Sequence, residues 1–125
     1  MRELRVRYLS KFTVRISMDG FCSTDIRISI RKDSVELVTD NKVLESVKRL
    51  PWIHLNRDYQ MELLSYEIIQ LLNKADYRKI YQEVFSIKFT DTVNLVREDE
   101  IYSAKEFAKR YFKAYDTKYA NFKFR

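Results

Sequence analysis

Apolar and polar residues alternate along the first forty positions of the chain. The apolar positions are Leu4, Val6 and Tyr8, then Phe12, Val14 and Ile16, then Ile26, Ile28 and Ile30, then Val35 and Leu37. A period of two is typical of a β-strand that buries one face and leaves the other to solvent. The pattern predicts an antiparallel meander of three or four strands over residues 1–39.

The connection between the second and third strands sets their register. A two-residue turn at residues 19–20 would place Ile26 and Ile16 on opposite faces of the sheet. A shared buried face forbids that arrangement. A longer loop over about 17–25 would pair Ile16 with Ile26 instead, and a bulge near residues 21–22 is the alternative. By the same reasoning, a four-residue loop at 31–34 pairs Ile28 with Leu37.

Beyond residue 40 the apolar spacing becomes helical. The set Val43, Leu44, Val47 and Leu50 predicts a helix capped by Asp40 or Asn41 and stopped by Pro51. A long helix is expected from about 57 to 73, with Asn56 or Asp58 as its cap. Asp76 starts another helix that ends near Glu83, and a hairpin near 84–97 follows it. Ser103 and Glu106 form a capping box for a last helix.

These elements predict an α+β fold. The N-terminal antiparallel sheet of three or four strands packs against three or four C-terminal helices, and residues 40–125 are mainly helical. A chain of 125 residues is expected to form a single domain, 1–125.

The other face of the predicted sheet gathers arginines. We expect Arg15 to lie opposite Arg27, Lys11 opposite Arg31, and Thr13 opposite Ser29, with Glu36 beside Ser29. The planar guanidinium group suits phosphate oxygens, and the candidate phosphate-binding residues on this face are Arg5, Arg7, Arg15, Arg27 and Arg31. Two other interpretations remain open: a solvated sheet face, and a face covered by a helix that carries Glu62 and Glu67.

Two further candidates lie near the C-terminus. Lys105, Lys109 and Lys113 recur every four residues, so they would form a row along the last helix. Such a row can follow a phosphate backbone, or it can be the solvent side of an amphipathic helix. The tail carries Tyr119, Phe122 and Phe124, which could stack on bases or pack on the core or a partner chain.

Charge and residue composition limit the classes of function that the protein can have. The net charge is +6, with basic residues in excess at both ends of the chain and acidic residues in excess between 51 and 100. One glycine and one proline exclude glycine-rich phosphate loops and dinucleotide fingerprints. The single cysteine, Cys22, favours a reducing, cytoplasmic location, and neither a signal peptide nor an apolar run of about 18 residues is found.

The sequence predicts a small, basic, non-catalytic protein that binds the phosphate backbone of DNA or RNA with little sequence specificity. The alternative is a protein-interaction module, an inhibitor, adaptor or subunit, that presents arginines and aromatics to an acidic protein surface. A metal-dependent nuclease is a third hypothesis. We expect no catalytic, cofactor-binding or metal site and no membrane partner, and a homo-oligomer is compatible with the sequence.

Overall fold

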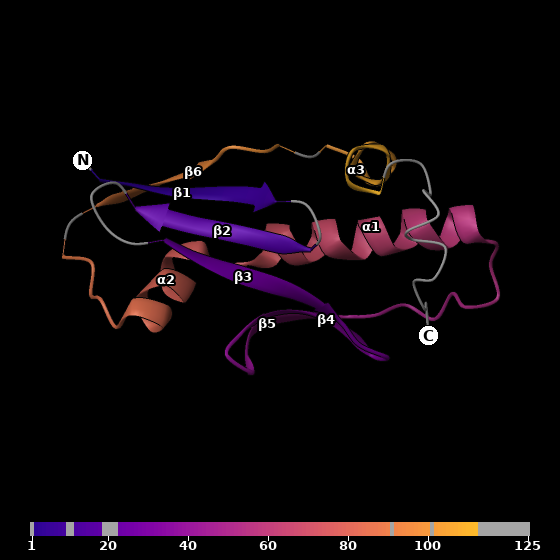
Figure 1. Ribbon diagram of the computed structural model, residues 1–125, viewed down its shortest axis with the longest axis horizontal. Coiled ribbons are helices and arrows are strands. Elements are labelled where there is room, and N and C mark those ends of the chain that lie inside the picture. Colours follow the sequence, from indigo (N-terminus) through magenta and orange to yellow (C-terminus); the bar gives the residue numbers. More distant parts are fainter. Residues whose placement is uncertain (1, 10–11, 19–22, 91, 101, 113–125) are drawn as a thin grey trace.

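A twisted sheet forms one layer of the fold and helices form the other (Figure 1). The computed structural model describes residues 2–9, 12–18, 23–90, 92–100 and 102–112. The strands are β1 (Arg2–Leu9), β2 (Thr13–Met18), β3 (Ser23–Ile30), β4 (Ser34–Thr39), β5 (Lys42–Lys48) and β6 (Val93–Arg97), and the helices are α1 (Arg57–Lys74), α2 (Tyr77–Phe85) and α3 (Ala104–Tyr111).

The strands follow the order β5-β4-β3-β2-β1-β6. Neighbours are antiparallel except β1 and β6, which are parallel. The α+β class is therefore confirmed, but the sheet has six described strands where three or four were expected. Both additional strands lie at the edges of the sheet, outside the predicted meander.

The predicted register is right for one strand pair and wrong for another. Ile28 lies opposite Leu37, as expected. In the β2–β3 pair Ile26 lies opposite Val14 rather than Ile16, a shift of two residues from the prediction. A two-residue shift keeps every side chain on its own face, so the apolar pattern alone cannot detect it.

The helix predicted over 43–50 is wrong, because that segment forms β5. Asp40 and Asn41 do not cap a helix; they form the two-residue turn between β4 and β5, with φ values of 46° and 66°. Positive φ at both central residues is the requirement of a type I′ hairpin turn, and Asp and Asn tolerate it better than most residues. A register shift between Leu37 and Val38 disturbs the alternation in β5, which is why its apolar residues mimic helical spacing.

The long helix and the two shorter ones begin where their caps were predicted. Asn56, Asp76 and Ser103 each accept a hydrogen bond from a backbone N–H in the first turn of α1, α2 and α3. The hairpin predicted near 84–97 is wrong. Residues 86–90 are not strand, and 93–97 form the single strand β6, which pairs with β1 from the other end of the chain.

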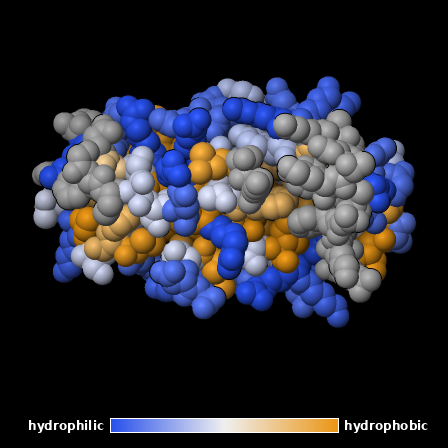
Figure 2. Space-filling model, in the orientation of Figure 1, coloured by the Kyte–Doolittle hydropathy of each residue, from blue (hydrophilic) through white to orange (hydrophobic). Residues whose placement is uncertain are grey.

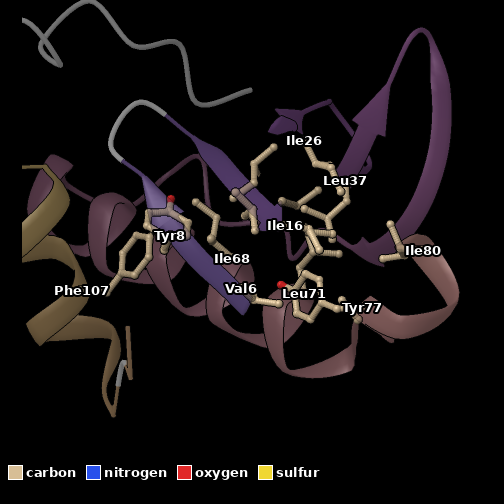
Figure 3. Packing of buried hydrophobic residues seen from close by; sticks show 14 of the residues in the cluster. Val6, Tyr8, Ile16, Ile26, Leu37, Ile68, Leu71, Tyr77, Ile80 and Phe107 are labelled. Carbon is tan, nitrogen blue, oxygen red and sulfur yellow. The ribbon is translucent and has the colours of Figure 1, made fainter. Parts of the chain in front are cut away.

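The core lies between the sheet and the helices. Figure 3 shows Val6, Ile16 and Leu37 of the strands directed toward Ile68 and Leu71 of α1. The α3 helix closes one end through ring contacts, and the Tyr8 and Phe107 centroids are 5.2 Å apart. In Figure 1, α2 lies toward one end of the long axis, and α3 lies above α1 on the other side of the middle.

A buried ion pair ties the segment after β5 to α1. The carboxylate of Glu67 accepts hydrogen bonds of 2.7 Å from both the Leu50 backbone N–H and the Trp52 indole. The Arg49 Nε lies 3.6 Å from Glu67 Oε2, and its guanidinium stacks 4.6 Å from the centre of the Trp52 ring. Burial raises the pKa of Glu67 and lowers that of Arg49, because a charged group loses its hydration there.

Candidate functional site

The described helices pack their apolar side chains against one face of the sheet, and the arginine positions lie on the other. The inward side chains of the strands share a single apolar cluster with residues of α1, α2 and α3. The alternative that the helix carrying Glu62 and Glu67 covers the arginine face is therefore wrong, because that helix is α1 and it packs on the core side. Glu67 is buried at Trp52, and Glu62 lines a hollow with Tyr59 and Lys105.

The outward positions of β1, β2 and β3 carry four of the five predicted arginines, with different neighbours from those expected, and Arg31 directly follows β3. Arg15 lies opposite Arg7 on one side and opposite Asp25 on the other, rather than opposite Arg27. Arg27 lies opposite Thr13, so the expected pair of Thr13 with Ser29 is also wrong. The predicted juxtaposition of Ser29 and Glu36 is confirmed. Lys11 lies outside the described residues.

Carboxylates from the same face neutralise three of the five arginines. Arg15 donates two hydrogen bonds to Asp25, at 2.7 and 3.1 Å. This contact raises the pKa of Arg15 and lowers that of Asp25. Arg5 contacts Glu3 at 2.9 Å and Glu98 at 3.0 Å, and Arg31 contacts Glu36 at 2.5 Å. All three pairs reach solvent, where ion pairs contribute little to stability and exchange readily.

The other two arginines, Arg7 and Arg27, are exposed and have no carboxylate partner among the described residues. Arg7 lies directly opposite Arg15, and like charges so placed repel each other; Asp25 beside Arg15 reduces this repulsion, and an anion at Arg7 would reduce it further. Arg7 also borders a hollow of about 510 Å³ at the end of the sheet, together with Arg110 and Tyr111 of α3. Arg110 pairs there with Asp99 at 2.7 Å.

The hydroxyl of Tyr111 is buried without a hydrogen-bond partner among the described groups. Burial raises the pKa of this tyrosine, so it is a neutral donor at physiological pH. The sequence did not single out Tyr111 as a site residue. Its helical spacing with Phe107 and Ala108 indicated only a core position, and the hollow beside Arg7 depends on how α3 packs against β1.

The predicted lysine row lies on a different part of the molecule from the arginine face. Lys105 shares a hollow with Asp58 and Tyr59 at the start of α1, whereas Arg7 shares its hollow with Arg110. Lys109 is exposed one turn further along α3. Lys113 and the predicted tail residues Tyr119, Phe122 and Phe124 lie outside the described residues.

The described residues contain no group of three histidine, cysteine, aspartate or glutamate side chains able to hold a metal ion. None of the helices in the described ranges is long and apolar enough to cross a membrane. Figure 2 shows a band of hydrophobic side chains along the middle of one face, with hydrophilic residues along its upper and lower margins. Comparison with protein-family models, curated proteins and solved structures finds no match to this chain.

Proposed function

We propose that the protein is a non-catalytic binding protein whose open sheet face holds the phosphate backbone of a nucleic acid. The observation that carries this proposal is the pair Arg7 and Arg27. Both are exposed on the face opposite the core, and neither has a carboxylate partner among the described residues. Guanidinium groups form strong bidentate hydrogen bonds with phosphate oxygens.

The paired arginines can join this contact. Arg15 lies between Arg7 and Asp25, and a phosphate could replace the carboxylate of Asp25 at little cost because the ion pair is exposed. Thr13, opposite Arg27, adds a hydroxyl group to the same patch. Together these groups offer contacts to consecutive phosphates across β1, β2 and β3.

The same face supports little sequence specificity. The outward positions of β1, β2 and β3 that the structure describes carry arginines, hydroxyl groups, carboxylates and Leu9, and none of them is aromatic. Stacking platforms for unpaired bases are built from aromatic side chains. Phosphate contacts position a protein on nucleic acid but carry no base information.

The test is fluorescence anisotropy of labelled single-stranded DNA, duplex DNA and RNA of random sequence. The variant Arg7→Ala/Arg27→Ala should bind every sequence more weakly than the wild type. Its matched control is Lys79→Ala/Lys88→Ala, which removes two exposed cations outside the strands and has the same net charge. Equal weakening in both variants would show that only the overall charge matters, which contradicts a defined binding face.

A protein partner is the second candidate, and the interleaved carboxylates favour it. Arg5, Arg15 and Arg31 each have an acidic neighbour on the same face. Alternating charges suit a partner surface of complementary pattern, because a partner with the wrong arrangement would place like charges together. In that case the wild type would show no nucleic-acid binding at low salt, and Arg7→Ala/Arg27→Ala would lose the partner in affinity capture.

A further inference from the structure

A cavity of about 320 Å³ lies on the opposite side of the sheet from the arginine face. Its walls come from the inward side of β1 and β2, from the second half of α1 and from the start of α2. Apolar and aromatic side chains form most of these walls, and they include Val6, Tyr8, Val14, Ile69, Leu72 and Tyr77. Cavities that bind small molecules span about 300–1,000 Å³, so this volume suits a ligand of small size.

The cavity is lined by one arginine, Arg97, which is exposed. Arg97 occupies the last position of β6, opposite Val6. Its guanidinium lies 5.6 Å from the centre of the Tyr77 ring and 3.5 Å from the side-chain oxygen of Asn73. Neither contact neutralises the charge, and Arg97 has no carboxylate partner among the described residues. The Tyr77 ring and the Asn73 side chain therefore orient the Arg97 guanidinium without neutralising its charge.

Two carboxylates, those of Asp99 and Glu100, line the same cavity as Arg97. Asp99 also lines the cavity, but it pairs with Arg110 at 2.7 Å. Glu100 has no cationic partner in the described part of the chain, and it accepts a hydrogen bond from the Tyr102 hydroxyl. The ring of Tyr102 borders the cavity while 78% of its surface is exposed. A large aromatic ring left in water beside an apolar cavity gains buried area when a ligand enters.

We propose that this cavity binds a small zwitterion with an apolar body, of the class of an α-amino acid with a large apolar side chain. The ligand carboxylate would meet Arg97 and the side-chain amide N–H of Asn73. Its ammonium group would meet Glu100. The apolar side chain would enter the cavity between β1 and α1. One unpaired charge of each sign beside an apolar cavity matches this ligand better than a purely anionic or cationic one.

The test uses three probes that differ only in their charged groups: L-phenylalanine, 3-phenylpropionate and 2-phenylethylamine. Each is titrated into the full-length protein while the methyl signals of Val6, Ile69 and Leu72 are followed by NMR. The expected result is saturable shifts at these methyls, with L-phenylalanine binding about tenfold more tightly than either probe that lacks one charge. If 3-phenylpropionate binds as tightly as L-phenylalanine, the preference for a zwitterion is wrong. If none of the three probes shifts the methyl signals, the cavity is not a binding site for this class of ligand.

Two exposed substitutions test the charged groups separately. Arg97→Gln should weaken L-phenylalanine about tenfold and leave 2-phenylethylamine unchanged. Glu100→Gln should do the reverse, weakening L-phenylalanine and leaving 3-phenylpropionate unchanged. Glu98→Gln is the matched control, because Glu98 pairs with Arg5 and does not line this cavity. An equal effect of Glu98→Gln would contradict the assignment. The comparison of the three probes on the wild type needs no variant to fold.

Discussion

The most demanding test of the fold is removal of the carboxylate of Glu67. This side chain is fully buried and receives two hydrogen bonds of 2.7 Å, from the Leu50 backbone and the Trp52 indole. It is also the carboxylate partner of Arg49, whose side chain is only 4% exposed. The substitution Glu67→Ala would remove all three contacts, including the negative charge that Glu67 places beside the buried guanidinium of Arg49.

The size of the effect follows from that geometry. Removal of one partner of a buried ion pair costs about 3–5 kcal/mol, because the remaining charge stays desolvated. For a chain of this length, each kcal/mol corresponds to about 4 °C in the unfolding temperature. Glu67→Ala should therefore lower the unfolding temperature by about 12–20 °C. The exposed Glu62, on the same helix, is the matched control, and Glu62→Ala should change stability by less than about 0.5 kcal/mol.

The assay is thermal and urea unfolding followed by far-UV circular dichroism, for the wild type, the two single variants and Arg49→Met/Glu67→Gln. The double variant removes both charges and keeps an acceptor for Leu50 and Trp52, so it should recover most of the stability lost by Glu67→Ala. If Glu67→Ala lowers the free energy of unfolding by less than about 1 kcal/mol, Glu67 does not form a buried ion pair, because a loss that small is typical of an exposed glutamate.

The pH dependence of this site has a definite sign. Burial raises the pKa of Glu67 in the folded state, so between its unfolded and folded pKa values the folded protein binds more protons than the unfolded one. The wild type should therefore lose stability relative to Glu67→Gln as the pH rises through that interval. If the wild type instead gains stability relative to Glu67→Gln as the pH rises, the pKa of Glu67 is not raised in the folded state.

Three further outcomes are expected. Asn41→Val places a β-branched residue at a φ of 66° and should lower stability by about 1–2 kcal/mol in urea unfolding, whereas Asn41→Gly should not. Phe107→Ala empties a fully buried site and should cost about 3–5 kcal/mol in the same assay. Asp25→Asn removes the carboxylate partner of Arg15 and should tighten nucleic-acid binding in anisotropy. The pKa of Asp25 is lowered in the folded state, so the small stabilisation from this carboxylate is present at neutral pH and is lost as the pH falls through the folded-state pKa.

The sequence predicted the arginine face because a period of two assigns side chains to faces without knowledge of the register. It placed Arg7, Arg15 and Arg27 on one side correctly. It paired Arg15 with the wrong neighbour, because registers that differ by two residues have the same apolar pattern. The bidentate contact of Arg15 with Asp25 accompanies the observed register, and such a contact depends on geometry that spacing does not specify.

The two edge strands were mispredicted for different reasons: β5 was predicted as a helix, and β6 was predicted as a strand with the wrong partner. In β5, a bulge interrupts the regular alternation of apolar and polar residues, so the sequence pattern predicts a helix there. The dipeptide Asp40-Asn41 between two apolar runs nevertheless favours a hairpin turn. In β6, the partner strand lies at the other end of the chain, so no local pattern could indicate the pairing. The cavity at Arg97 depends on that pairing and was therefore beyond the reach of the sequence.

The central claim is that the open face of β1, β2 and β3 binds a phosphate backbone through Arg7 and Arg27. The most direct measurement is the dependence of binding on salt for wild type and Arg7→Ala/Arg27→Ala, with labelled duplex DNA. Each phosphate contact contributes a slope of about 0.9 in the plot of log affinity against log salt concentration, so the double variant should lose about 1.8 units. An unchanged slope, or no binding by the wild type at low salt, would contradict the claim.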